Sequence, residues 1–256
     1  MTEAPPDTTT DAFLDGSLML RQPKRGHRAG HDAILLAAAT AARPGDRVIE
    51  FGTGVGVAGL ALARRVNGLD LTLIEISEPL AALARENAAA HAIAANVLTL
   101  DVTSSAAVFE AAGLRADSAD AVLMNPPFND PGRHRASSDP DRRLAHVASE
   151  TTLDDWTHAA RRALKSGGAL TLIWRADGLA EVLAALGRGF GSLAIVPVHP
   201  DLNSPAIRIL VRAIKGGRAP LQMLPALALN NAAGEPSIEA QDVLAGRAAL
   251  PLAAFK

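Results

Sequence analysis

Four residues with complementary chemistry follow the apolar run 121–124: Asn125, Pro126, Pro127 and Phe128. The asparagine amide is a neutral hydrogen-bonding group, Pro126 has no backbone N–H to donate, and Phe128 offers a flat apolar face. The amide oxygen and a carbonyl of the proline region can together accept both hydrogens of a planar NH2 group. These residues are therefore predicted to hold an amino group while its nitrogen attacks an electrophile, mainly by positioning.

A glycine-rich turn between a predicted strand and a predicted helix is the candidate site for the electrophile. Residues 50–56 read Glu-Phe-Gly-Thr-Gly-Val-Gly, and the glycines permit a tight turn and close approach of a ligand. The G-x-G-x-G spacing differs from the G-x-G-x-x-G of dinucleotide sites. Glu50 also suits an ammonium group better than a pyrophosphate. S-adenosylmethionine carries a sulfonium and an amino-acid tail and has no phosphate, so it fits this turn.

Acidic residues end the next two predicted strands. Glu75 is placed to accept the hydrogen bonds of a ribose diol, and Asp101 to meet an adenine amino group, because open α/β sheets bind ligands at the carboxyl ends of their strands. The full set of predicted cofactor residues is Glu50, Gly52, Thr53, Gly54, Gly56, Glu75, Asp101 and Asn125.

The elements that must position these residues alternate between strand and helix, which predicts an α/β fold with a parallel, doubly wound sheet. Predicted strands cover 47–51, 70–75, 96–100, 120–124 and 169–174, and predicted helices cover 33–42, 57–66, 78–91, 104–112, 153–164 and 179–187. Asp32 is predicted to cap the first helix, and 166–168 to end the fifth. Strands at 193–198 and 207–213 are too close for a parallel crossover and predict a terminal antiparallel hairpin.

Length and composition limit the remaining possibilities. The 256 residues are 48% hydrophobic, carry a net charge of −2 and include no cysteine, so thiolate catalysis and cysteine-bound metals are excluded. No apolar run is long enough to predict a membrane span, and the N-terminus does not read as a signal peptide, so a cytoplasmic protein is expected. The expected organisation is a disordered tail at 1–11, the main domain with a short N-terminal extension at 12–215, and a C-terminal extension at 216–256.

The Glu-x-Gly-x-Gly-x-Gly turn and the terminal hairpin resemble those of class I methyltransferases, which have a Rossmann-like fold. The resemblance implies that Glu50 and the glycines of the turn line the methionine moiety of S-adenosylmethionine. It also implies the ribose role for Glu75 and the adenine role for Asp101. Asn-Pro-Pro-Phe is similar to the motif of enzymes that methylate adenine N6, guanine N2 or glutamine N5.

A finer resemblance, over residues 12–215, is to the tRNA(Val) adenine-N6 methyltransferase family. It is carried by Asn125–Asn129, by the segment Gly26–Ala37 and by the basic run Arg133-His134-Arg135. The resemblance implies a structured RNA substrate, most simply a tRNA, with the target adenine turned out into the pocket, and no metal or membrane partner. Two basic clusters are expected to contact phosphates: Lys24, Arg25 and Arg28, and Arg133 and Arg135.

Three alternatives share parts of this pattern. A protein glutamine-N5 methyltransferase offers the same planar amide chemistry, but such enzymes usually carry a helical domain before the core, and only about 46 residues precede the first predicted strand here. A guanine-N2 rRNA methyltransferase usually carries a duplicated domain. A catalytically inactive RNA-binding subunit is expected to have lost the glycines or the Asn-Pro-Pro motif, and both are present.

Overall fold

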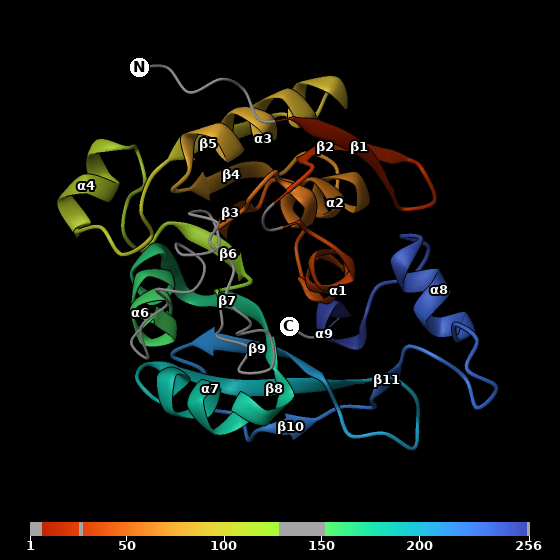
Figure 1. The fold of residues 1–256 in the computed structure, drawn as a ribbon. Helices are drawn as coiled ribbons and strands as arrows, with labels where there is room; N and C mark the ends of the chain where they lie inside the picture. Colours follow the sequence, from red (N-terminus) through yellow and green to blue (C-terminus); the bar gives the residue numbers. More distant parts are fainter. Residues whose placement is uncertain (1–6, 26–27, 128–151, 255–256) are drawn as a thin grey trace.

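A computed structural model describes residues 7–25, 28–127 and 152–254, and its central element is a nine-stranded sheet (Figure 1). The strand order is β10-β8-β9-β7-β6-β3-β4-β5, and β11 also pairs with β8. The strands are β3 (Arg47–Phe51), β4 (Asp70–Glu75), β5 (Ala95–Thr99), β6 (Ala119–Met124), β7 (Leu164–Arg175), β8 (Phe190–His199), β9 (Arg208–Lys215), β10 (Gln222–Met223) and β11 (Leu227–Ala228). The five parallel strands β3–β7 and the antiparallel pair β8–β9 confirm the predicted fold class.

Helices cover both faces of the sheet (Figure 1). One layer contains α1 (His31–Ala39), α2 (Val57–Arg65), α3 (Glu78–Ala90), α8 (Ile238–Leu244) and α9 (Pro251–Ala254), and the other contains α4 (Ala106–Ala111), α6 (Thr152–Ala163) and α7 (Leu179–Leu186). The central strands are buried on both faces, which explains why β3 and β6 carry apolar residues at successive positions, such as Val48-Ile49 and 121–124, instead of alternating patterns.

An N-terminal hairpin packs outside the sheet. It consists of β1 (Thr8–Phe13) and β2 (Leu18–Pro23), paired antiparallel. Residues 8–11 therefore belong to a strand, and the expectation of a disordered tail is wrong for them. The hairpin is held because Leu18 and Leu20 on alternate positions of β2 are fully buried in the core with α1, α2 and α3.

Two local expectations need correction. Asp32 does not cap α1, because the helix begins at His31 after Gly30, and the Asp32 carboxylate instead accepts a hydrogen bond from Arg208 Nε at 2.9 Å. Residues 166–168 do not end the fifth predicted helix, because α6 already ends at Ala163 and β7 begins at Leu164. They occupy an irregularity between the pairs that β7 makes with Ala119 and Ala121. Most other helix and strand ends fall within one to three residues of their predicted places.

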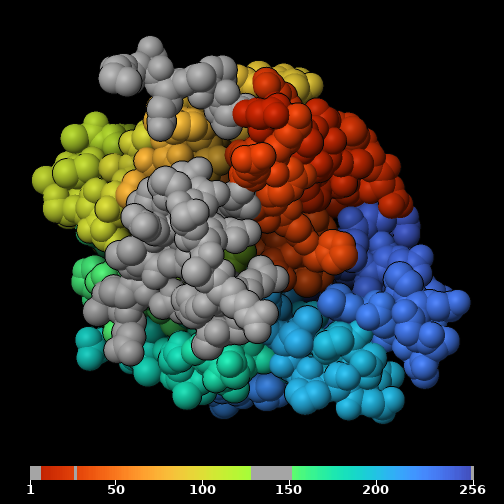
Figure 2. Space-filling model, in the orientation of Figure 1, coloured from red at the N-terminus to blue at the C-terminus, as the bar shows by residue number. Residues whose placement is uncertain are grey.

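The C-terminal segment is part of the folded body. β10 and β11 run parallel to β8 and continue the sheet beyond the predicted hairpin. Ser237 caps α8 by accepting a hydrogen bond from the N–H of Ala240, and Arg247 pairs with Asp15 in the β1–β2 turn. The N-terminal hairpin and the C-terminal segment therefore meet at the surface (Figure 2). No helix of the described residues is long and apolar enough to cross a membrane.

Candidate active site

The candidate residues gather where four parallel strands end. Phe51 of β3 pairs with Ile74 of β4 on one side and with Met124 of β6 on the other, so the residues that follow leave the sheet side by side. Glu75 in turn pairs with Thr99 of β5. The glycine turn, Glu75, Asp101 and Asn125 therefore share the carboxyl edge of the sheet, as the sequence predicts. The gathering follows from parallel strand order alone.

Glu50 is the most perturbed acid of this edge. Its side chain is 5% exposed, and its Oε2 accepts hydrogen bonds from Thr53 Oγ1 at 2.6 Å and from the N–H of Gly59 at 2.8 Å. Burial raises the pKa of Glu50 to about 7 against the opposing effect of these two hydrogen bonds, and the nearby charge of Glu75 raises it further. A cation bound here lowers this electrostatic cost, because it favours the ionised form of Glu50.

Glu75 braces the glycine turn from the neighbouring strand. Its Oε2 accepts a hydrogen bond from the N–H of Gly54 at 2.8 Å, and its Oε1 accepts one from the N–H of Ser77 at 2.9 Å. Asp101 is exposed, and its Oδ1 accepts hydrogen bonds from the N–H and the hydroxyl of Thr103, both at 2.8 Å. Both carboxylates are thus fixed in orientation at the sheet edge before any ligand binds.

Asn125 carries the unusual acceptor of the site. Its Oδ1 is buried and has no hydrogen-bond donor among the described residues. Pro126 and Pro127, which follow it, have no backbone N–H, so the next two positions of the chain offer it no main-chain donor. A buried acceptor without a donor costs free energy, about 1–3 kcal/mol. The arrangement is suited to an N–H group supplied by a ligand. Phe128 lies outside the described residues.

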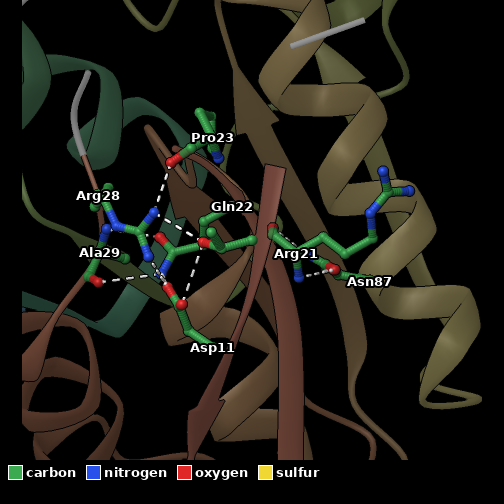
Figure 3. Close-up of polar contacts among 8 residues, drawn as sticks. Asp11, Arg21, Gln22, Pro23, Arg28, Ala29 and Asn87 are labelled. Atoms are coloured by element: carbon green, nitrogen blue, oxygen red, sulfur yellow. Dashed lines mark hydrogen bonds and ion pairs between the residues drawn. The ribbon is translucent and has the colours of Figure 1, made fainter. Parts of the chain in front are cut away.

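The basic residues of the N-terminal cluster are mostly engaged within the protein. Lys24 pairs with Asp7. Arg28 pairs with Asp11 and donates to Pro23 O at 2.8 Å (Figure 3). Arg25 is exposed. Arg28 therefore secures the β1–β2 hairpin, and only Arg25 of this cluster presents a charge without a carboxylate partner among the described residues. Arg133 and Arg135 lie outside them.

Sequence reasoning did not identify three residues that shape this edge. Asn87 of α3 is 2% exposed, and its Nδ2 donates to Val55 O of the glycine turn at 3.0 Å. A β-carbon at Gly59 would lie 2.6 Å from Glu50 Oε2, so only glycine admits the carboxylate. Trp156 of α6 is the third, because its ring lies against the glycine turn: a β-carbon at Gly52 would lie 2.5 Å from its Cη2. Only the place of Gly59 in the helix after the turn hinted at its role, because helical glycines are costly.

The residues present fit S-adenosylmethionine. Gly52 has a φ of +64°, and a β-carbon at Gly54, which has a φ of +57°, would meet nothing within 4 Å, so the turn presents open backbone at Gly54. The buried carboxylate of Glu50 provides negative charge beside that turn. Ile76, next to Glu75, is an apolar side chain that is 55% exposed and is available to cover a flat ring.

Comparison with known proteins agrees with this geometry. Residues 30–200 match the methyltransferase small domain family. A tRNA1(Val) (adenine(37)-N6)-methyltransferase of Erwinia tasmaniensis is 28% identical over 186 residues, which cover 72% of this chain and 74% of the relative. A release factor glutamine methyltransferase of Chlorobaculum tepidum is 28% identical over 201 residues, which cover 75% of this chain and 67% of the relative.

A solved structure extends the likeness to the whole fold. The crystal structure of a predicted O-methyltransferase from Agrobacterium tumefaciens has a TM-score of 0.71 and 34% identity, and it covers 86% of this chain and 98% of its own. The family match spans well over half of the sequence and includes the glycine turn and the Asn-Pro-Pro motif. The protein therefore belongs to the methyltransferase small domain family and is an S-adenosylmethionine-dependent methyltransferase.

Proposed function

We propose that this enzyme methylates an exocyclic amino group, and that the acceptor is N6 of an adenine in tRNA. The observation that carries the proposal is the buried Oδ1 of Asn125, which has no donor among the described residues and stands beside the glycine turn. An NH2 group bound there satisfies the acceptor and is held next to the cofactor. A hydroxyl acceptor has a single hydrogen, so it suits this motif less well.

The roles of the residues follow from these contacts. S-adenosylmethionine supplies a methyl group on a sulfonium, which is the electrophile. Glu50 and the backbone of the turn bind its charged end, and Glu75 is placed for its ribose. Asn125 Oδ1 accepts an N–H of the substrate, which draws the nitrogen lone pair out of conjugation and holds the nitrogen in place. The bound cofactor would supply the methyl group, so that an N–C bond would replace its C–S bond and the extra proton on nitrogen would pass to solvent.

Adenine in tRNA is favoured by the segment Gly26–Ala37 and by the relative from Erwinia tasmaniensis, which its name assigns to adenine 37 of tRNA1(Val). Glutamine N5 is the second candidate. The observation in its favour is the equal identity of the relative named as a release factor glutamine methyltransferase. Both acceptors present a planar NH2 group, so Asn125 alone does not choose between them.

The deciding experiment supplies both acceptors. The enzyme is incubated with radiolabelled S-adenosylmethionine and either tRNA from a strain that lacks the gene or a peptide-chain release factor, and the products are identified by mass spectrometry. We expect N6-methyladenosine in tRNA. Label in the release factor, or N2-methylguanosine in RNA, contradicts the adenine proposal and identifies the true acceptor. O-methylated product contradicts the role given to Asn125.

A further inference from the structure

Trp156 brings an aromatic ring to the candidate active site from a distant part of the sequence. It lies in the first half of α6 and is partly exposed. Its ring centroid is 6.4 Å from that of Phe51, and the two planes are 83° apart, so the rings meet edge to face. A β-carbon at Gly52 would lie 2.5 Å from Cη2 of the indole and 3.1 Å from Cζ3. The six-membered end of the indole therefore rests directly on the backbone of Gly52.

This contact brings the indole to the end of the strand pair from which Asn125 also leaves the sheet. Phe51 and Met124 are paired in the register of β3 and β6, so Gly52 and Asn125 are the first residues beyond the two paired strand ends. An aromatic ring that touches Gly52 thus flanks the point where the cofactor turn and the Asn125 amide come together. The other tryptophan, Trp174, is 5% exposed in the core of β7 and serves as an internal comparison.

We infer that Trp156 is a substrate-binding residue, which forms an apolar wall for the flat methyl acceptor while Asn125 Oδ1 accepts its N–H. This inference rests on the proposed function, because it takes the acceptor to be a planar base. An amide with one acceptor oxygen fixes the amino group at one point and leaves the plane of the base free to turn. A rigid ring on one side fixes that plane and so directs the lone pair toward the methyl carbon.

The same contact gives Gly52 a second requirement for glycine. Its φ of +64° already favours glycine, and the indole occupies the space that any side chain would need. The absence of a side chain at Gly52 thus allows the indole to approach the turn closely enough to line the site. Edge contact with Phe51 holds the ring in place, and Phe51 is itself held edge to face by Phe109 at 6.3 Å.

The first test separates acceptor binding from cofactor binding. Trp156→Leu removes the wall and Trp156→Phe keeps an aromatic face, while Trp174→Phe is the matched control for loss of an indole in the core of β7. We expect Trp156→Leu to raise the KM for tRNA about tenfold or more, since that is the effect of losing a base–aromatic stack, and to leave the Kd for S-adenosylmethionine within about twofold. Trp156→Phe should recover most of the loss. An unchanged KM, or equal weakening of tRNA and S-adenosylmethionine, overturns the inference.

The second test measures the fluorescence of the Trp156 indole, so it does not depend on normal folding of the leucine variant. The chain contains two tryptophans and no tyrosine, so Trp174→Phe leaves Trp156 as the main source of fluorescence. We expect a short adenine-containing RNA to quench this emission in the presence of S-adenosylhomocysteine. If anisotropy shows that the RNA binds while the emission stays unchanged, Trp156 does not form a wall of the acceptor site. Wild-type enzyme that methylates no tRNA refutes the proposed function first and this inference with it.

Discussion

Glu50 is a buried acid whose protonation changes near neutral pH. Burial is the largest cause of its raised pKa of about 7, and the hydrogen bonds from Thr53 and Gly59 only partly oppose it. The free enzyme at pH 7 is therefore a mixture of protonated and ionised forms. A cationic ligand selects the ionised form, so binding of S-adenosylmethionine is expected to release a proton.

The affinity for S-adenosylmethionine should consequently fall as the pH drops below about 7. We expect the Kd to rise by up to tenfold for each pH unit below that point, because an increasing fraction of Glu50 is protonated. Calorimetric titration between pH 5.5 and 8.5 measures this. Glu50→Gln should bind more weakly and show little pH dependence, and an equally steep profile in that variant would assign the titration to another group.

The stability of the ligand-free enzyme should change with pH in the opposite sense. The folded pKa of about 7 lies above the ordinary glutamate pKa of 4.5, so folding disfavours the ionised carboxyl. The resulting loss in the free energy of unfolding is absent below about pH 4.5 and grows as the pH rises. It is complete above about pH 7, where it amounts to roughly 3 kcal/mol. Glu50→Gln should therefore raise the free energy of unfolding at pH 8 and change it little at pH 5. Urea denaturation at both pH values measures this, and equal destabilisation at both would contradict it.

Asn125→Ala tests the acceptor side at the same scale. The variant removes the amide that holds the NH2 group and keeps the two prolines. We expect kcat to fall by about 100-fold or more, as for loss of one key positioning contact in an active site, and the Kd for S-adenosylmethionine to stay within about twofold. Single-turnover methyl transfer and calorimetry measure the two quantities. Parallel loss of both would show that Asn125 supports the fold of the site.

At the scale of elements, the central parallel strands could be predicted well because short apolar segments mark them in the sequence. β3 and β4 have the bounds that their apolar runs predict, 47–51 and 70–75. Candidate site residues could also be placed, because parallel strands bring their carboxyl ends to one edge. The role of Asp32 could not be predicted. Its partner Arg208 is 176 positions away in the sequence, and the hydrogen bond between them takes the place of the local capping role.

The β1–β2 hairpin was missed for a similar reason. The run 8–10 is three threonines and has no apolar alternation. Its partner strand is tied to α3, where Asn87 Oδ1 accepts the N–H of Arg21 at 2.8 Å and Asn87 Nδ2 donates to Arg21 O at 3.1 Å (Figure 3). These contacts span 66 positions, so no local pattern reports them. Trp156 was missed likewise, since its neighbour Gly52 is more than 100 residues away.

Asn87 should therefore connect the hairpin to cofactor binding, because the same amide also holds Val55 O of the glycine turn. We expect Asn87→Leu to lower the free energy of unfolding by about 1–3 kcal/mol, since it leaves buried backbone groups without partners, and to weaken S-adenosylmethionine binding several-fold. Denaturation and calorimetry measure these effects. Asn96→Ala, at an exposed site on β5, is the matched control. Normal cofactor affinity in Asn87→Leu would show that the hairpin and the turn are independent.

At the scale of the whole molecule, the first and last segments complete one body. Val243, Leu250 and Leu252 of the C-terminal segment are buried in the same core as Leu18 and Leu20 of the hairpin. Arg247 joins Asp15 to Asp242 at the surface, and hydrogen bonds to these two carboxylates raise its pKa. Residues far beyond the family match at 30–200 thus contribute to the core on which α1 and α2 rest.

The two short strands β10 and β11 have a consequence for solubility. They occupy the outer hydrogen-bonding side of β8, whose residues Ile195, Val196 and Val198 are fully buried. An enzyme shortened to end at Lys215 should expose that apolar strand, and an open strand edge is a template for pairing with another chain. We expect the shortened protein to self-associate in light scattering at concentrations where the full chain stays monodisperse. Residues 216–256 would then prevent aggregation by covering the edge of β8. A monodisperse shortened protein would show that β8 does not need this cover.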